Sequence, residues 1–388
     1  MRIGQFIQSI DTTAGGTSTA FLNMLDALRT RPELAVRAFC TPPAHDDPAW
    51  EQINANPGQF SCVAGYGRAL WPGPTGRSVV RAIESGEIDL LHIHGLWSPD
   101  LMGAALACLR ARIPYVWEPH GMLAREAYAQ KRWKKELFMA LGMRRALAGA
   151  GALVFVTADE RDQSIIPRAV GLDRTRVIPL PVAMPPMPIT QEMRRAARVR
   201  FGLPADAPVV GFMGRFHHVK RIDMAMRAFA SCPVPDARLL LIGGGEEEPR
   251  LRSLADSLHL ADRVVFAGWV KGDDKWLALA AADVLTLNSI HENFGYVAVE
   301  ALCVGTAPVL TSNLALAREV GAAQIATIAE PDERSLAHAL TSALARRDWS
   351  ATLERGGAWV SQRFSPAAVG TTLLALYQEV IAGRVGAR

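Results

Sequence analysis

The sequence predicts an α/β protein built from two similar units, each with a parallel sheet covered by helices on both faces. Short apolar runs typical of buried strands alternate with amphipathic helical stretches along nearly the whole chain, which is the pattern of such sheets. The alternation stops once, at a proline-rich stretch near the middle, and then restarts. The length of 388 residues exceeds one ordinary domain and suits two.

The first half opens with a strand, a helix and a second strand, and further strands follow. The helix is predicted over Ser18–Thr30. The strands are predicted at Arg2–Ile7, Leu34–Cys40, Leu90–His94, Tyr115–Glu118 and Ala152–Thr157. We therefore expect the first unit to cover residues 1–182.

A dense run of prolines between Ile178 and Pro188 resists both helix and sheet and makes a semi-rigid connector. We expect the linker at residues 183–191 and the second unit at 192–365. The second unit is predicted to contain strands Pro208–Met213, Arg238–Ile242, Val264–Phe266, Val284–Asn288 and Ala307–Thr311, and helices Ile222–Phe229 and Tyr296–Val304. The closing residues 366–388 read as an amphipathic helix, and the pattern leaves open whether it packs back on the first unit.

The composition is that of a globular protein, with 49% apolar and 21% charged residues. A net charge of +4 without long basic blocks argues against nucleic acid as a partner. The five cysteines are scattered and form no Cys-x-x-Cys pair, which indicates buried thiols of a reducing compartment. No signal-peptide pattern occurs, and no apolar run approaches the roughly 18 residues that span a bilayer. We expect a cytoplasmic chain, at most peripheral on the inner face of the cytoplasmic membrane.

The most informative stretch is Ser289-Ile-His-Glu-Asn-Phe-Gly-Tyr-Val-Ala-Val-Glu300. It joins a predicted strand to a predicted helix, so Glu292 should lie on the loop and Glu300 about one turn into the helix. Ligands of α/β sheets bind at such loops, and a helix N-terminus favours an anion. Carboxylates on either side of an anion site indicate hydroxyl groups flanking a phosphate, which is the layout of a nucleotide sugar.

Three further loops follow predicted strands in the second half. Arg215 and Lys220 lie five residues apart, and two cations beside backbone amides can neutralise a diphosphate. The turn Gly243–Gly245 permits close backbone approach, and Gly268 ends a third strand. Taken singly, these are a solvated basic loop and two ordinary turns. Their convergence at strand ends of one unit favours a binding site.

In the first half, the loop before the first helix would bring the backbone amides of Gly15, Gly16 and Thr17 toward an anion. His120 follows another strand, although a lone histidine is more often structural than catalytic. His92 and His94 are interpreted as strand-end packing, because no third ligand with metal spacing follows them.

Several common motifs are absent from the sequence. There is no Asp-x-Asp for a metal ion, no Gly-x-x-x-x-Gly-Lys-Ser/Thr phosphate loop and no Gly-x-Ser-x-Gly elbow. Without a metal-binding carboxylate pair, Arg215, Lys220 and helix N-termini must supply the positive charge. We therefore expect no cofactor and no divalent metal.

These residues resemble the retaining family-4 glycosyltransferases, which have two Rossmann-like domains facing each other across a cleft (the GT-B fold). The matching pieces run nearly end to end, and Glu292-x7-Glu300 is the most specific of them. The other matching segments are Gly15-Gly16, Ile88–His94, His120-Gly121, Thr157–Glu160, Gly214-Arg215 with Lys220, Gly243–Gly245 and Phe266–Gly268. Members that build bacterial exopolysaccharide or other surface glycans are also similar at His94–Ser98, Pro119–Leu123 and Gln130–Lys135.

By position, the resemblance implies that Arg215 and Lys220 bind the donor diphosphate and that Glu300 holds the ribose hydroxyls. Glu292 would hold hydroxyls of the transferred sugar, and His120 would contact this sugar near the reacting centre. Further donor contacts are implied for Gly15, Gly16, Thr17, Gly243, Asn293, Phe294 and Gly295. Trp269 and Val270 would lie near the base and contact it through backbone atoms.

Three positions depart from the family's usual pattern. Arg221 stands where glycine commonly follows the lysine, and Leu180-Pro181 replaces Asn-Gly before the linker. The segment Gly305–Pro308 carries an extra step before its proline. The first two should alter loop conformation and hinging, but none removes a residue assigned to the chemistry.

The function expected from the resemblance is transfer of a hexose from a UDP- or GDP-sugar to a hydroxyl of a glycan or lipid-linked glycan. The resemblance implies retention at the anomeric carbon by a front-face route, in which the leaving diphosphate takes the acceptor proton. Two alternatives stay open. One is a nicotinamide-dependent oxidoreductase, which the missing Gly-x-Gly-x-x-Gly fingerprint disfavours. The other is a catalytically inactive sugar-nucleotide binding protein.

The stretch Lys131–Arg145 combines basic residues with Trp133, Leu137, Phe138 and Leu141. Such a stretch is either a surface helix packed on its own domain or a docking site for anionic lipid, where a lipid-linked acceptor would be found.

Overall fold

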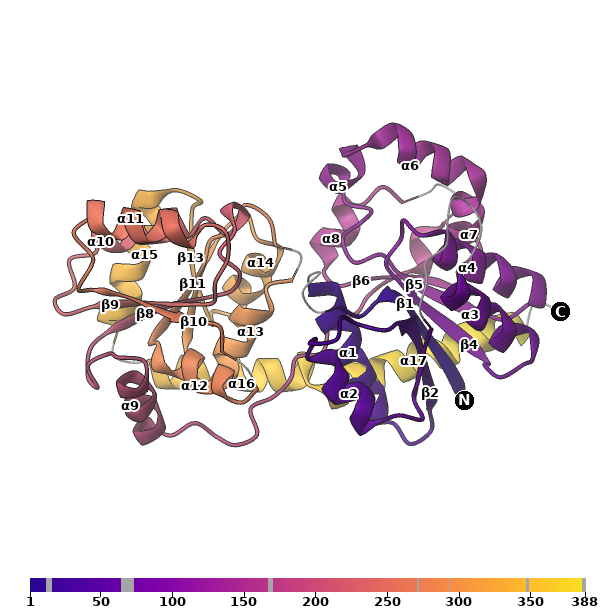
Figure 1. Cartoon of the computed structure of the whole chain (residues 1–388), viewed down its shortest axis with the longest axis horizontal. Coiled ribbons are helices and arrows are strands. Elements are labelled where there is room, and N and C mark those ends of the chain that lie inside the picture. Colours follow the sequence, from indigo (N-terminus) through magenta and orange to yellow (C-terminus); the bar gives the residue numbers. More distant parts are fainter. Residues whose placement is uncertain are drawn as a thin grey trace. The chain divides into compact units, whose positions relative to one another are not determined.

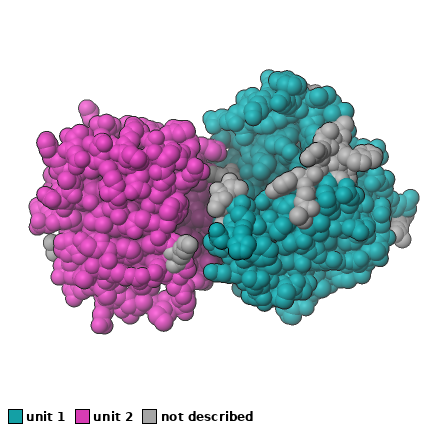
Figure 2. All heavy atoms as spheres, in the orientation of Figure 1, with its two compact units in different colours: residues 1–181, 364–388 teal, residues 182–363 magenta. Residues whose placement is uncertain are grey.

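The computed structural model describes residues 1–11, 16–63, 73–166, 170–270, 272–292, 294–346 and 349–385. The chain divides into two compact units, unit 1 with residues 1–181 and 364–388, and unit 2 with residues 182–363 (Figure 2). The expected linker counts with unit 2, and the closing helix counts with unit 1. Each unit is a parallel sheet between helices, as the alternating pattern predicts (Figure 1).

The described part of unit 1 forms a seven-stranded sheet in the order β3-β2-β1-β4-β5-β6-β7. Its strands are β1 (Arg2–Ser9), β2 (Ala35–Thr41), β3 (Phe60–Cys62), β4 (Leu90–His94), β5 (Tyr115–Glu118), β6 (Ala152–Phe155) and β7 (Thr175–Val177). Its helices are α1 (Gly16–Arg29), α2 (Ala49–Ala55), α3 (Pro74–Glu84), α4 (Pro99–Ala111), α5 (Arg125–Ala129), α6 (Arg132–Phe138), α7 (Arg144–Ala148), α8 (Ala158–Gln163) and α17 (Pro366–Val385). A π-helical turn, Met139–Met143, joins α6 to α7.

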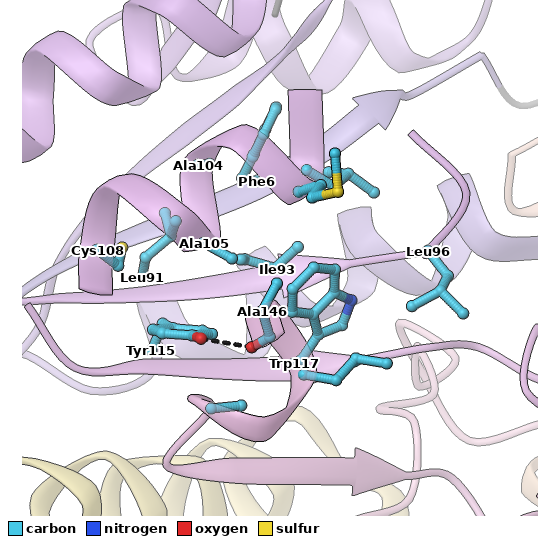
Figure 3. Close-up of a cluster of buried hydrophobic side chains, with 14 of the residues drawn as sticks. Phe6, Leu91, Ile93, Leu96, Ala104, Ala105, Cys108, Tyr115, Trp117 and Ala146 are labelled. Atoms are coloured by element: carbon cyan, nitrogen blue, oxygen red, sulfur yellow. Dashed lines mark hydrogen bonds between the residues drawn. The ribbon is translucent and has the colours of Figure 1, made fainter. Parts of the chain in front are cut away.

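One face of this sheet carries the main hydrophobic core of unit 1. Successive residues of a strand point to opposite faces, so Tyr115 and Trp117 of β5 share this face with Leu91 and Ile93 of β4 (Figure 3). The hydroxyl of the fully buried Tyr115 donates to the Ala146 carbonyl of α7, which satisfies its one donor within the core. The alternate residues of the same strands lie on the other face, which becomes important for the site.

The described part of unit 2 forms a six-stranded sheet in the order β10-β9-β8-β11-β12-β13. Its strands are β8 (Val209–Met213), β9 (Arg238–Ile242), β10 (Val264–Gly268), β11 (Val284–Leu287), β12 (Ala307–Thr311) and β13 (Thr327–Ala329). Its helices are α9 (Gln191–Arg200), α10 (Ile222–Ala230), α11 (Glu248–Ser257), α12 (Asp274–Ala281), α13 (Tyr296–Cys303), α14 (Ala315–Ala322), α15 (Glu333–Ala345) and α16 (Trp349–Phe364).

Capping side chains begin several of these helices. Ser98 Oγ accepts the Asp100 amide of α4 at 3.2 Å, with a proline in the first turn. Thr157 Oγ1 accepts the Glu160 amide of α8 at 3.0 Å, and Asp332 accepts the Ser335 amide of α15 at 2.9 Å. Each cap satisfies an amide that has no partner within the helix, which stabilises the helix by about 1 kcal/mol.

The ten strands expected from the sequence are confirmed, within about two residues at their ends. Three strands were not expected, namely β3, β7 and β13, and each has only three residues. The closing helix α17 packs against α1. None of the described helices is both long and apolar enough to span a bilayer.

Candidate active site

Lys220 and Glu292 form an ion pair in unit 2, at the carboxyl ends of the central strands. Lys220 ends a 3₁₀ turn after β8, and Glu292 lies on the loop between β11 and α13. The Lys220 ammonium donates to a Glu292 carboxylate oxygen, and both side chains are about three-quarters buried. The two side chains that the resemblance assigns to the diphosphate and to the sugar are therefore neighbours.

Polar side chains hold the loop that carries Glu292. Ser289 Oγ donates to the same carboxylate at 3.3 Å, and Asn313 Nδ2 donates to the Ser289 and Ile290 carbonyls at 3.0 and 2.9 Å. Asn288 Nδ2 donates to the Arg221 carbonyl at 2.6 Å, which ties this loop to the one carrying Lys220. The carboxylate is thus held before any ligand arrives, which is what a positioned binding group requires.

Helix α13 begins at the end of this loop. Gly295 precedes it with φ +81°, a left-handed conformation that favours glycine. Phe294 is buried and packs edge-on against Tyr296 with ring centroids 5.0 Å apart. Glu300 lies just over one turn into the helix, is 8% exposed, and accepts a bond from Lys275 Nζ of α12 at 3.0 Å. Lys275 was missed by the sequence reasoning because 25 residues separate it from its partner.

Arg215 follows β8 and is more exposed than Lys220. Its guanidinium donates to Glu246 at 3.2 Å, and the other oxygen of Glu246 lies 3.4 Å from His217 Nε2. The pKa of Glu246 is lowered by a hydrogen bond from its own amide and also by Arg215 and His217. Exposed ion pairs of this kind contribute little stability, about 0–1 kcal/mol. Arg215 can therefore leave Glu246 for a more highly charged anion at small cost.

Backbone hydrogen bonds connect the glycine loops after β8, β9 and β10. The Gly214 amide donates to Ile242 at 2.9 Å, and the Gly243 amide donates to Gly268 at 2.8 Å. Gly243 has φ +131°, and a Cβ there would stand 2.0 Å from the Gly214 carbonyl oxygen. Only glycine fits this contact, so its place in the turn is a packing requirement of the strand ends.

Trp269 and Val270 lie just beyond β10. The Trp269 side chain is 63% exposed, whereas Val270 is half-buried. A Cβ on Gly244 would come within 2.8 Å of the indole nitrogen of Trp269. The glycine therefore leaves room for a large, exposed aromatic ring beside the glycine loop, and such a ring is a ready stacking surface for a base.

Arg221, where the family commonly has glycine, adopts the left-handed conformation with φ +49° and ψ +44°. The conformation explains why glycine suits this position, and a non-glycine residue there costs about 1–2 kcal/mol. Its side chain donates to the Pro331 carbonyl at 3.2 Å.

In unit 1, His120 lies in a tight turn after β5. His120 and Gly121 both have positive φ, at +51° and +76°. The Gly121 amide donates to Glu160 Oε1 at 2.5 Å, and the Val156 amide donates to Glu160 Oε2 at 2.7 Å. The His120 imidazole is turned inward and its side chain is only 2% exposed. His120 thus follows its strand as expected, but its side chain is buried, which the sequence did not reveal.

His92 and His94 are fully buried, yet they are more than packing at a strand end. Their β4 positions face the sheet surface opposite the core of Figure 3, together with Glu118 of β5 and Gln5 of β1. The sequence offered no third residue with metal spacing, but the sheet brings Glu118 within 3.6 Å of both imidazoles. Parallel pairing of separate segments, which local spacing does not reveal, made this cluster.

Unit 1 also has a pocket of about 430 Å³ at the ends of β1 and β4. Thr17 at the start of α1 lines it, and so do His94, Trp97 and Met122. Gly16 is exposed at the first position of α1. Gly15 and Asn293, which were also expected to contact the donor, lie outside the described residues.

The predicted site residues therefore fall into two groups. Arg215, Lys220, Gly243, Trp269, Val270, Glu292, Phe294, Gly295 and Glu300 belong to unit 2, and Gly16, Thr17 and His120 belong to unit 1. Within unit 2 they gather on the loops at the carboxyl ends of β8 to β11 and on the helix that follows β11. Ligands of open α/β sheets bind at this edge.

Two family models match the chain, one in each half. The model described as "Glycosyl transferase 4-like domain" matches residues 15–183. The model described as "Glycosyl transferases group 1" matches residues 193–357, which contain all of the unit 2 site residues.

Two relatives are enzymes with named acceptors. The D-inositol 3-phosphate glycosyltransferase of Xylanimonas cellulosilytica is 30% identical over 306 residues, which cover 76% of this chain and 72% of that protein. The 2-deoxystreptamine glucosyltransferase of Streptomyces kanamyceticus is 28% identical over 324 residues, which cover 76% of this chain and 78% of that protein.

Solved structures share the fold. HepE of Anabaena in complex with UDP has a TM-score of 0.79 and 21% identity, and the match covers 97% of this chain and 100% of that chain. The structure of HepE with UDP-glucose has a TM-score of 0.75, also at 21% identity, and all of both chains is covered.

Proposed function

The chain belongs to the family-4 glycosyltransferases with the GT-B fold, and we propose that it moves a hexose from a nucleoside diphosphate sugar to an acceptor hydroxyl with retention. The Lys220–Glu292 pair carries this proposal, because it sets a cation beside a carboxylate that is already oriented. A diphosphate needs the first group and a sugar hydroxyl needs the second.

The chemistry follows from the charges of unit 2. Lys220 and Arg215 would bind the diphosphate and stabilise the charge that develops on it as the glycosidic bond breaks. Glu292 would hold hydroxyls of the transferred sugar, and Glu300 would hold those of the ribose. The leaving phosphate itself would take the proton of the acceptor hydroxyl on the same face, so the route needs no enzymatic nucleophile and retains the configuration.

The donor is proposed to be a UDP-sugar, supported by HepE, whose solved complexes contain UDP and UDP-glucose. A ligand that binds the native state stabilises it and so raises its melting temperature. At a ligand concentration of 100 times the dissociation constant, the added free energy of unfolding is about 2.7 kcal/mol. We expect UDP-glucose or another UDP-sugar to raise the melting temperature of the chain by several degrees, and GDP- and ADP-sugars to raise it less. A thermal-shift screen measures this.

The matched control for the screen uses two arginines of unit 2. Arg215→Ala should lose most of the shift, whereas Arg250→Ala should keep it. Arg250 is as exposed as Arg215, at 59% against 61%, and is also paired with a neighbouring glutamate, but it lies on α11. Equal shifts in the two variants would count against Arg215 as a phosphate ligand. Donor binding should not need a divalent metal, because the cationic side chains supply the positive charge. Added chelator should therefore leave the thermal shift unchanged.

The acceptor is proposed to be a hydroxyl of a glycan or a lipid-linked glycan, in the synthesis of a bacterial surface polysaccharide. The pocket of unit 1 is a suitable place, since Trp97 offers an aromatic wall for a sugar ring, and Thr17 and Ser18 offer hydroxyls. Release of radiolabelled sugar to water, or its transfer to an added acceptor, separates this proposal from an inactive binding protein.

Membrane docking is part of the proposal, and the exposed side chains of α6 and the turn after it support it. Trp133, Leu137 and Leu141 are 69%, 54% and 48% exposed, among basic residues that include Lys131 and Lys134. An apolar strip edged by cations suits the headgroup region of an anionic bilayer. This would hold the chain at the cytoplasmic face of the membrane, beside a lipid-linked acceptor.

Vesicle co-sedimentation tests the docking. The chain should sediment with phosphatidylglycerol vesicles and much less with phosphatidylcholine vesicles. Lys131→Glu with Lys134→Glu should weaken binding about 5-fold or more for each lysine, since each contributes about 1 kcal/mol near the surface. Trp133→Ala should weaken it as well, while Val199→Ala, which removes an equally exposed residue of α9, should not. Binding that is indifferent to lipid charge would contradict the proposal.

A further inference from the structure

Six polar side chains gather on the face of the unit 1 sheet opposite its main core. Strands β1, β4 and β5 supply four of them, α17 supplies one, and the turn after β5 supplies one. They are Gln5, His92, His94, Glu118, His120 and Tyr377, and none is more than 8% exposed. Buried polar groups need partners, so their hydrogen bonds can be followed one by one.

Hydrogen bonds link five of these side chains in a row. The amide of Gln5 donates to the Tyr377 hydroxyl at 2.9 Å, and that hydroxyl lies 2.9 Å from Nδ1 of His92. On its other side, Gln5 Oε1 accepts from Nε2 of His94 at 2.7 Å. Nδ1 of His94 lies 3.0 Å from Nε2 of His120.

The two ends of this row both face Glu118. His92 Nε2 lies 3.6 Å from one carboxyl oxygen, and His120 Nδ1 lies 3.4 Å from the other. His92 Nε2 and both oxygens of Glu118 have no hydrogen-bond partner among the described residues. A slight approach of the carboxyl group would close the row into a ring, if the protons allow it.

The protons on the His94 arm follow from Gln5. Its carbonyl oxygen can only accept, so His94 carries its proton on Nε2 and accepts at Nδ1 from His120 Nε2. A neutral His120 then has a bare lone pair on Nδ1. A carboxylate facing this lone pair repels it, whereas a protonated Glu118 donates to it.

The protons on the Tyr377 arm agree. The Tyr377 hydroxyl accepts from Gln5 and therefore donates to His92 Nδ1. His92 then carries its proton on Nε2, which donates to the second oxygen of Glu118. Each of the six side chains now donates once and accepts once. If the Gln5 amide is turned over, every bond reverses, and Glu118 must still bring one proton, now to His92.

We propose that Glu118 is a positioning residue, which holds a proton in the native protein and thereby closes a hydrogen-bonded ring that fixes the orientation of His120. The ring contains one proton more than a carboxylate and three neutral imidazoles would hold. His120 is thus held from two sides, by His94 and by Glu118, and its turn is held by Glu160.

Burial supports this protonation. Burial raises the pKa of Glu118 well above its usual value, and the nearby Glu160 raises it further. Burial lowers the pKa of both His92 and His120 to about 3, and it also lowers the pKa of His94. The neutral form of each group is favoured, as the ring requires.

Among the described residues, titratable groups on four neighbouring segments face Glu118. They are His92 and His94 on β4, His120 on its turn, Glu160 on α8 and Tyr377 on α17. Burial raises the pKa of Glu160, whose oxygens accept two backbone amides. No arginine or lysine is among the groups that shift the pKa of Glu118, so none compensates an ionised carboxylate.

A metal ion is the competing explanation, because His92, His94 and Glu118 each bring one suitable atom within 4.8 Å of the others. Coordination would require the lone pair of His94 Nδ1. That atom already lies at hydrogen-bonding distance from His120, at 3.0 Å. The bonds present therefore favour a proton.

The first test compares the wild type with Glu118→Gln at several pH values. Glutamine can donate to His120 and accept from His92 without holding an ionisable proton. In the wild type, Glu118 stays protonated in the folded state, whereas the unfolded chain loses this proton above about pH 4.5. The free energy of unfolding of the wild type therefore falls as pH rises. The melting temperature of Glu118→Gln minus that of the wild type should rise by about 2–3 °C per pH unit between about pH 5 and 8. A difference that stays constant with pH would overturn the proposal.

The second test needs no substitution in the ring. Nitrogen-15 NMR of labelled histidines distinguishes neutral from charged imidazoles and identifies the protonated nitrogen. We expect His92, His94 and His120 to be neutral across this range, with the proton on the same ring nitrogen in all three. A doubly protonated His120, or one equivalent of metal in the purified chain, would overturn the proposal.

The consequence for catalysis rests on the proposed function. Glu118→Leu and Tyr377→Phe should lower kcat on the order of 10- to 100-fold, because a small misplacement of His120 has effects of this size, with little change in donor KM. Glu118→Gln should restore kcat. Tyr115→Phe is the control, because it removes an equally buried hydroxyl of β5 that lies outside the ring. It should leave kcat unchanged. Melting and NMR need no turnover, so they judge the ring even if the transferase assignment fails.

Discussion

Replacing Lys220 with alanine is expected to slow sugar transfer by on the order of 10²-fold or more, and replacing Arg215 should have a similar effect. In the proposed mechanism these two side chains stabilise the charge on the leaving diphosphate, since the sequence contains no Asp-x-Asp for a metal ion. Removal of Lys220 also leaves Glu292, three-quarters buried, without its cation. Initial rates with a radiolabelled donor measure the loss.

The two replacements are best read together and against Arg250→Ala, which removes an equally exposed cation from α11. If the cations act on the leaving group, kcat falls more than donor affinity does, because the charge develops only in the transition state. Normal turnover by the Arg215→Ala, Lys220→Ala double variant would refute the assignment of the site.

Gly243→Ala is expected to have the largest effect on the fold of the glycine loops after β8, β9 and β10. The added methyl group would stand 2.0 Å from the Gly214 carbonyl oxygen, at a φ of +131° that alanine avoids. Overlap and strain together should destabilise unit 2 by about 3 kcal/mol or more. Because Gly214 precedes Arg215, the same shift should move the residue that we propose as a phosphate ligand, and activity should fall even in the folded fraction.

Thermal unfolding and initial rates of Gly243→Ala measure the two effects separately. Gly357→Ala is the matched control in the same unit. A Cβ there meets nothing within 4 Å, and the residue lies inside α16. It should be neutral or stabilise the chain by about 0.5–1 kcal/mol, since alanine favours helix. Equal behaviour of the two variants would mean that the contact between Gly243 and Gly214 is not as close as described.

Much of the fold was predictable because long apolar strands and helices carry a clear period. The strands at Leu90–His94, Tyr115–Glu118 and Arg238–Ile242 have the bounds read from the sequence. The short strands β3, β7 and β13 were missed because three residues are too few to show a period. They add to sheets that longer strands have already formed, and pairing, more than local preference, makes them strands.

The site was predictable in part. Glu292 and Glu300 lie on the loop and in the helix where the strand-to-helix pattern placed them. The ion pair between Lys220 and Glu292 was not foreseen. The partnerships of Glu300 with Lys275 and of Arg215 with Glu246 were not foreseen. Each joins loops or helices that are adjacent only after the sheet has formed.

What the sequence by itself determined is the alternation of strands and helices, the two units and the positions of the chemical groups along them. These are local properties, set by periodicity and by turn residues. Only the tertiary structure decided which groups meet and which way they face. His120 is the clearest case, since the sequence put it on a loop, but the fold turns its imidazole inward. Four strand residues that alternate away from the core, one tyrosine from a helix at the far end of the chain and this histidine meet there. Their hydrogen-bond partners, which no local pattern encodes, determine where we propose that their protons lie.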